Sequence, residues 1–168
     1  MSGVSDWFRA YGFADVYPEL LIGAYPLDRG DIAMLSQLEI QRILNLVEDE
    51  EYAPGQRAEI TAQLDAAGIE ETRLKLTDYG RLPADAVDAA VDLVLSWLNE
   101  GRRCYVHCRA GRQRSAAVAA GVIALEEGID IDSALSLVRR RKPSANPLPH
   151  QREDLLEWWQ GRSLAGGP

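Results

Sequence analysis

A short polar segment, residues 107–115, carries the side chains best suited to chemistry. It reads His-Cys-Arg-Ala-Gly-Arg-Gln-Arg-Ser, with Cys108 six positions before Arg114 and Ser115 directly after the arginine. An apolar run typical of a β-strand precedes it, and an alanine- and valine-rich run typical of a helix follows it. A loop at a helix N-terminus directs backbone N–H groups and the positive end of the helix dipole at a bound anion. The pattern therefore predicts a phosphate-binding loop, here called the cysteine loop.

The side chains of the cysteine loop suit nucleophilic attack on phosphorus. The field that binds an anion also stabilises a thiolate, so we expect the pKa of Cys108 to lie below the free value of about 8.5. Arg114 can hold two phosphate oxygens with its planar guanidinium, and Ser115 can donate a hydrogen bond to the sulfur. His107 is expected to orient the loop and tune the cysteine, and Gly111 to allow positive φ or close backbone approach. The expected phosphate-binding residues are Arg109, Ala110, Gly111, Arg112, Gln113 and Arg114.

The sequence resembles the cysteine-dependent protein tyrosine phosphatases, in their compact dual-specificity form. Beyond the cysteine loop, residues 17–23 are similar to that family's opening strands and residues 43–47 to its core strand. Residues 141–147 are similar to the basic, proline-containing segment before its last helix. The resemblance spans about residues 16–160 and implies a phosphomonoester hydrolase that forms a cysteinyl-phosphate.

The resemblance also implies roles outside the cysteine loop. Asn45, in the core strand, would brace the phosphate loop, and Asp78, thirty positions before Cys108, takes the place of the general acid. Asp78 must be protonated while Cys108 is deprotonated, which predicts a bell-shaped pH profile. Tyr79 and Arg81 share its loop and are candidates for the rim of the pocket. The alternative for all three loop residues is a solvated surface turn.

Arg109 and Arg112 make the loop unusually basic and leave two substrate classes open. The leading interpretation is a protein tyrosine or dual-specificity phosphatase. The alternative is a phosphatase for phosphoinositides, phosphatidylglycerophosphate or inositol phosphates, because family members with those substrates tend to carry basic residues at these two places. A phosphate-binding pseudophosphatase is a remote alternative, since nucleophile, arginine and acid are all present. Arg112 is a further rim candidate.

The expected mechanism has two steps and needs no cofactor. Cys108 attacks phosphorus while Arg114 and the loop amides hold the equatorial oxygens, and Asp78 protonates the leaving oxygen. Water activated by Asp78 then releases phosphate, and Ser115 stabilises the returning thiolate. Arginine and amide dipoles supply the positive charge, so neither a metal nor an organic cofactor is expected.

Two other roles for the cysteines, a zinc site and a disulfide, have less support in the sequence. A zinc site would need Cys104, His107 and Cys108 to be completed by His150, and no paired-ligand spacing supports it. A disulfide between the two cysteines requires Cα atoms within about 7 Å, whereas an extended strand between them spans about 13 Å. We expect Cys104 to be a small buried apolar residue.

Length and charge limit the class of protein. With 168 residues and ordinary apolar content, we expect one catalytic domain over residues 1–162 and a disordered tail over 163–168. The net charge of −8 argues against nucleic acid and anionic membranes as partners. The N-terminus does not read as a signal peptide, and no apolar run reaches membrane-spanning length. The expected protein is cytoplasmic and monomeric, acting on a phosphorylated protein or small molecule without integral membrane association.

The order of secondary structure predicts an α/β fold. Alternating strands and helices imply a mixed, mostly parallel sheet of about four to five strands with helices on both faces. We expect residues 48–51 to be a solvated acidic loop, and the tryptophans to be packing residues. The expected strands are 16–22 (one or two), 42–47, 72–76 and 103–107, and the expected helices are 28–38, 54–67, 83–100, 115–127, 132–141 and 149–159.

Overall fold

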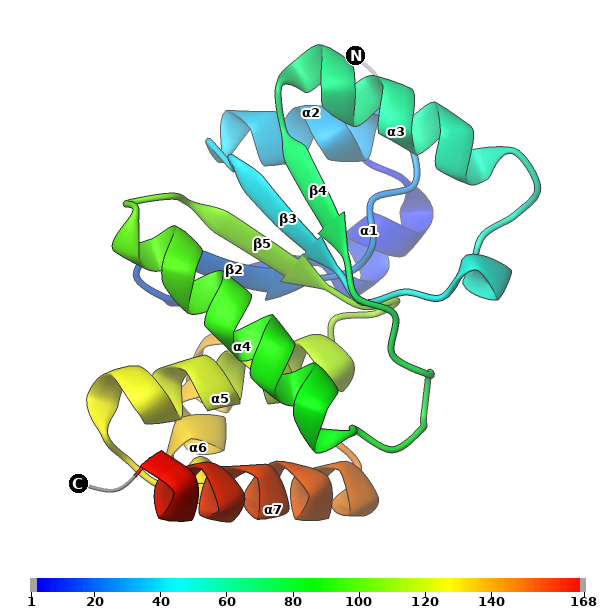
Figure 1. Ribbon diagram of the computed structural model, residues 1–168. Helices are drawn as coiled ribbons and strands as arrows, with labels where there is room; N and C mark the ends of the chain where they lie inside the picture. Colours follow the sequence, from blue (N-terminus) through cyan, green and yellow to red (C-terminus); the bar gives the residue numbers. More distant parts are fainter. Residues whose placement is uncertain (1–2, 167–168) are drawn as a thin grey trace.

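A five-stranded mixed sheet lies at the centre of the computed structural model (Figure 1), in the strand order β1-β2-β5-β3-β4. The structure describes residues 3–166, without the side chains of 163–166. The edge strand β1 (Phe13–Tyr17) is antiparallel to β2 (Leu20–Gly23), and the other pairs are parallel. The parallel set continues with β3 (Arg42–Asn45), β4 (Glu70–Arg73) and β5 (Cys104–His107). The predicted α/β class is confirmed.

Helices cover both faces of the sheet and enclose two apolar cores. Successive side chains of a strand point to opposite faces. In β5, Cys104 and Val106 therefore face one core while Tyr105 faces the other. One face is covered by α1 (Asp6–Tyr11), α2 (Arg29–Gln37) and α3 (Gln56–Ala67), and the opposite face by α4 (Ala84–Asn99), α5 (Arg114–Glu127), α6 (Ile131–Arg141) and α7 (Pro149–Gly166).

Helix α5 lies at the centre of its layer because its residues are small. Every residue from Arg114 to Ala124 is buried, which confirms the predicted buried helix. A Cβ added at Gly121 would lie 2.8 Å from a Val91 methyl carbon, so α4 packs too closely there for a side chain. The first residues of α5, Arg114 and Ser115, are themselves buried, so the end of the cysteine loop lies in this closely packed layer.

The parallel strands bring three loops to one edge of the sheet. The carboxyl ends of β3, β4 and β5 lie side by side in register, with Asn45 opposite both Arg73 and His107. Ligands in open α/β sheets bind outside this edge. The loops that carry Glu51, Asp78 and Cys108 all begin there, although they are far apart in the sequence.

The two ends of the chain differ from expectation. Helix α1 was not predicted; Ser5 caps it by accepting a hydrogen bond from the Phe8 N–H. Helix α7 was expected to end at residue 159, but its helical backbone continues to Gly166 and so enters the segment expected to be a tail. Residues 167–168 of that segment lie outside the described residues. No helix in the described part is long and apolar enough to cross a membrane.

Candidate active site

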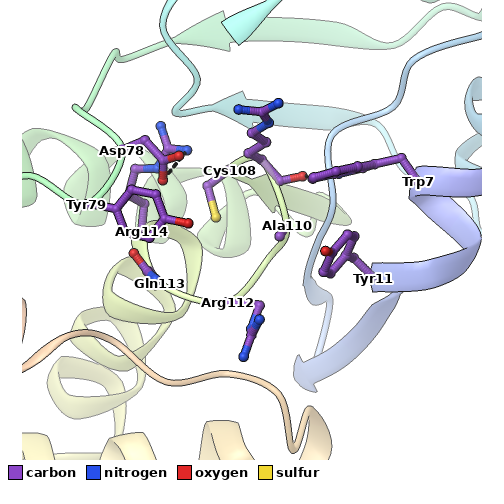
Figure 2. Close-up of a pocket in the computed structure, with 10 residues that line it drawn as sticks. Trp7, Tyr11, Asp78, Tyr79, Cys108, Ala110, Arg112, Gln113 and Arg114 are labelled. Atoms are coloured by element: carbon purple, nitrogen blue, oxygen red, sulfur yellow. Dashed lines mark hydrogen bonds and ion pairs between the residues drawn. The ribbon is translucent and has the colours of Figure 1, made fainter.

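A cavity of about 300 Å³ opens above the cysteine loop. Figure 2 shows Trp7 and Tyr11 of α1 on one side of it, Asp78 and Tyr79 on the other, and the Cys108 sulfur between them. Its lining residues are Trp7, Tyr11, Asp78, Tyr79, Cys108, Arg109, Ala110, Arg112, Gln113 and Arg114. The structure therefore brings the predicted nucleophile, arginine and acid into one cavity.

The backbone of the cysteine loop is fixed by its neighbours. Gly111 has φ of 69°, and a Cβ there would lie 2.5 Å from the Gly23 carbonyl carbon, so the expected need for glycine is confirmed. Ala110 forms a β-bridge to Ala24, and the Asn146 N–H donates to the Arg112 carbonyl at 2.6 Å. The loop is thus held in shape by protein contacts on both sides.

Cys108 has an environment that favours its thiolate. Burial alone would raise its pKa, but the charge of Arg114 and hydrogen bonds from Ser115 and the Gln113 N–H outweigh burial, so its pKa is lowered. The Cys108 sulfur lies 3.3 Å from the Ser115 hydroxyl oxygen. Burial raises the pKa of Cys104 to about 12, and both cysteines are free. Cys104 is fully buried, as expected for a packing residue.

Glu51 holds the guanidinium of Arg114, which sequence reasoning missed. The two Nη atoms of Arg114 donate to the two carboxylate oxygens of Glu51, both at 2.8 Å. The Arg114 side chain is 1% exposed and that of Glu51 9%. The expectation of a solvated loop over residues 48–51 is therefore wrong for Glu51, and Asp49 also pairs with Arg73 and Lys75. Sequence spacing gave no signal, because the partner lies 63 positions away.

A polar network positions the segment that carries Glu51. The Asn45 side chain donates to the Tyr52 hydroxyl at 2.9 Å and to Glu71 at 3.0 Å, and accepts from the Val47 N–H at 2.8 Å. Arg57 pairs with the same Glu71 carboxylate. The side chain of Asn45 thus fixes the segment after β3, and its link to the cysteine loop runs through Glu51 and Arg114.

Asp78 lies beside Arg114 on the opposite wall from α1. Its carboxylate oxygen is 3.2 Å from an Nη atom of Arg114, and its side chain is 27% exposed. Tyr79 is exposed and lines the cavity, as expected for a rim residue. Arg81 is not among the lining residues, because it pairs with Asp154 at 2.6 Å. Of the two alternatives left open for Arg81, a rim residue or a surface residue, the structure favours the surface residue.

The two additional arginines of the loop are placed differently. Arg109 lies over the Trp7 ring at 5.3 Å, and the Trp7 indole N–H donates to the Arg109 carbonyl at 2.7 Å. Trp7 is therefore part of the cavity wall, and the expectation that it only packs is wrong. Trp97 and Trp158 are buried in the core, as expected. Arg112 is exposed and points away from Cys108 in Figure 2, toward the outer rim.

His107 is a buried neutral side chain behind the nucleophile. Its Nδ1 lies 3.1 Å from the Cys108 carbonyl oxygen, which only accepts hydrogen bonds, so Nδ1 carries a proton. Burial lowers the pKa of His107 to about 4. The Nε2 atom is buried without a hydrogen-bond partner, which agrees with an uncharged ring. Within residues 3–166, no cluster of three or more His, Cys, Asp and Glu side chains could hold a metal ion.

Replacing Glu51 by alanine is expected to destabilise the protein, because Arg114 would stay buried without its carboxylate. We expect a loss of about 3 kcal/mol in the free energy of unfolding, measured by urea titration of tryptophan fluorescence. The matched control is Glu50→Ala, an exposed neighbour expected to change stability by less than about 0.5 kcal/mol. Equal losses for the two variants would contradict a structural ion pair.

His107 is expected to make stability fall in acid. The folded state keeps His107 neutral down to about pH 4, whereas the unfolded chain binds a proton below about pH 6.5. The unfolded state then binds more protons, so the free energy of unfolding should fall by about 2 kcal/mol between pH 7 and pH 4.5 from this group. His107→Asn, which keeps a donor for the Cys108 carbonyl, should reduce the fall by that amount. An unchanged pH dependence would show that another group causes it.

Comparison with known proteins assigns the family. The family model for the dual specificity phosphatase catalytic domain matches residues 21–161. Human phosphatidylglycerophosphatase and protein-tyrosine phosphatase 1 is 24% identical over 154 residues, covering 91% of this chain and 73% of that protein. Mouse dual specificity phosphatase 28 is 30% identical over 135 residues, covering 80% and 76%.

The fold agrees with that assignment. The crystal structure of PTPMT1 in complex with PI(5)P superimposes with a TM-score of 0.79 at 22% identity, covering 92% of this chain and 99% of that one. Likeness at this identity shows the fold, and the family match over most of the chain supplies the class of chemistry. The chain belongs to the dual specificity phosphatase family and is a cysteine-dependent phosphatase.

Proposed function

We propose that Cys108, Arg114, Asp78 and Ser115 hydrolyse phosphomonoesters through a cysteinyl-phosphate intermediate. The observation that carries the assignment is a cysteine with a lowered pKa in the same cavity as an arginine and a carboxylic acid that lie 3.2 Å apart. Reaction through Cys108 needs a bound phosphate above the sulfur. The cysteine loop and Arg114 supply the donors for it.

Arg114 meets the phosphate with the donors that Glu51 leaves free. Both Nη atoms donate to Glu51, while the buried Nε atom has no protein partner. The Nε atom is therefore the guanidinium donor that remains for a phosphate oxygen. In the first step the Cys108 sulfur bonds to phosphorus, the bond from phosphorus to the leaving oxygen breaks, and Asp78 gives that oxygen its proton.

The second step regenerates the thiolate. Asp78, now a carboxylate, takes a proton from a water molecule whose oxygen attacks phosphorus. The bond between sulfur and phosphorus breaks, and inorganic phosphate leaves. Ser115, 3.3 Å from the sulfur, donates a hydrogen bond that stabilises the thiolate as it forms.

Cys108→Ser should abolish turnover but keep binding of a phosphate analogue such as tungstate. Serine is nearly isosteric with cysteine, while its hydroxyl ionises far less readily and is a weak nucleophile without a base. The loop amides and Arg114 remain in place to bind the anion. Phosphate release is measured with malachite green, and tungstate binding by calorimetry. Substantial turnover by the purified variant would contradict the covalent mechanism.

The aromatic walls of the cavity favour phosphotyrosine in a protein as the leading substrate. Trp7, Tyr11 and Tyr79 line the space around Cys108 on opposite sides. Flat aromatic leaving groups pack well against aromatic side chains, in offset or edge-to-face geometry. A phosphorylated tyrosine ring that enters this cavity would contact them while its phosphate reaches the cysteine loop. We therefore infer a protein tyrosine or dual-specificity phosphatase.

Arg112 supports a second candidate, a phosphatase for phosphatidylglycerophosphate, phosphoinositides or inositol phosphates. The side chain is exposed at the rim and makes no ion pair with the described residues. A second phosphate next to the scissile one would provide a charge-assisted partner for it. The names of two relatives, a phosphatidylglycerophosphatase and protein-tyrosine phosphatase and a PI(5)P-bound structure, support the same class.

Arg112→Ala tested on a substrate panel separates the two candidates. Hydrolysis of a small aryl phosphate should stay within a few-fold of wild type, because that substrate does not reach the rim. For a multiply anionic substrate we expect KM to rise about tenfold or more, from loss of one charge-assisted hydrogen bond. The panel contains phosphotyrosine peptides with and without acidic neighbours, inositol phosphates and phosphatidylglycerophosphate.

Arg140→Ala is the matched control for Arg112→Ala. Arg140 is an exposed arginine on α6 that does not line the cavity, so its removal changes net charge without changing the rim. A rise in KM confined to lipid and inositol substrates would favour the second candidate, and one confined to acidic phosphopeptides the first. Equal losses on aryl phosphate and on multiply anionic substrates would mean that Arg112 only shapes the loop.

A further inference from the structure

The loop that carries Asp78 is bonded to the start of helix α7. We call residues 77–83 the acid loop. His150, in the first turn of α7, has its Nε2 atom 2.8 Å from the Tyr79 carbonyl oxygen. Because a carbonyl oxygen only accepts, Nε2 carries the proton and donates it. The two residues are 71 positions apart in the sequence, and Tyr79 directly follows Asp78.

Two further side chains of α7 bind the acid loop. Gln151, which is fully buried, donates from its side-chain nitrogen to the Gly80 carbonyl at 3.1 Å. Asp154 accepts from the Leu82 N–H at 2.7 Å. In a strand or helix, backbone N–H and C=O groups bond to other backbone groups. In the acid loop, side chains of α7 provide these hydrogen bonds instead.

The acid loop needs such support because its backbone is strained. Tyr79 has φ of 60°, a left-handed conformation that residues other than glycine rarely adopt. Strained conformations persist only when surrounding contacts enforce them. The conformation turns the chain sharply after Asp78, and in it Asp78 reaches Arg114 at 3.2 Å. The Tyr79 carbonyl that His150 holds belongs to the strained residue itself.

We propose that His150 is a positioning residue that holds Asp78 over the cavity for proton transfer. Gln151 also accepts from the Leu148 N–H at the start of α7, and Asp154 also pairs with Arg81, so both have structural duties elsewhere. The hydrogen bond to Tyr79 is the one contact of the His150 side chain among the described hydrogen bonds. The inference rests on the proposed role of Asp78 as the general acid.

Comparing two substrates with different leaving groups distinguishes a positioning role of His150 from a general loss of active-site structure. Phenyl phosphate has a poor leaving group that needs the proton of Asp78, whereas 4-nitrophenyl phosphate needs it much less. For His150→Ala we expect kcat to fall about tenfold on phenyl phosphate and less than about twofold on 4-nitrophenyl phosphate, with KM nearly unchanged. His150→Gln, whose amide N–H can reach the same carbonyl, should restore most of the loss.

A matched control and a double variant complete the test. Glu153→Ala, at an exposed position in the same helix, should leave both substrates unaffected. In an Asp78→Ala background, His150→Ala should cause no further loss, because the proton donor it positions is gone. If His150→Ala does not fold, His150→Asn, with an amide too short for the carbonyl, takes its place.

The proposal is overturned if the loss is equal on both substrates, persists undiminished without Asp78, or is not restored by glutamine. The same measurements separate it from the proposed function. A normal leaving-group dependence for Asp78→Ala, with none for His150→Ala, would remove only the positioning role. No leaving-group dependence for Asp78→Ala would remove the acid assignment and the positioning role together.

Discussion

The site depends on one set of interactions, those that hold the buried guanidinium of Arg114 in place. A charged side chain that is 1% exposed is stable only when its charge and its donors are compensated. Glu51 supplies the charge, and the carbonyl oxygens of Leu46 and Leu76 accept from the same Nη1 atom at 3.3 and 2.9 Å. These acceptors follow β3 and β4, while Arg114 begins α5. One side chain therefore joins the loops of three neighbouring strands.

The same guanidinium sets the electrostatic balance of the cavity. Burial would lower the pKa of Arg114, but Glu51, Cys108 and Asp78 raise it, so the positive charge persists. In return, Arg114 is the main group that lowers the pKa of Cys108 against the cost of burial. Since Glu51 takes the Nη atoms, its carboxylate orients the arginine without closing the Nε edge. The ion pair thus fixes the orientation of the guanidinium and leaves the Nε donor without a partner among the described residues.

The parts of this site that could be predicted from sequence are the local ones. The cysteine loop is a continuous segment, so its glycine follows from its own nine residues, and its strand and helix follow from the runs directly before and after it. Asp78 was found because its place before Cys108 resembles a known family. Glu51, Trp7 and His150 act through contacts between distant segments. Their positions depend on strand order and on how helices pack on the sheet, and no spacing within one chain reports that.

Similar reasoning explains why the sequence did not predict the contacts of the Asn45 and Arg81 side chains. Each lies in the right element, but the direction of a side chain depends on which partner competes for it. Glu71 and Tyr52 accept hydrogen bonds from the amide of Asn45, and Asp154 accepts one from the guanidinium of Arg81.

The family match begins at residue 21, whereas Trp7 and Tyr11 of α1 precede it. The candidate nucleophile, acid and arginine therefore lie within the matched segment, while the residues that form one wall of the cavity lie outside it. A change in α1 would therefore alter one wall of the cavity without altering the cysteine loop.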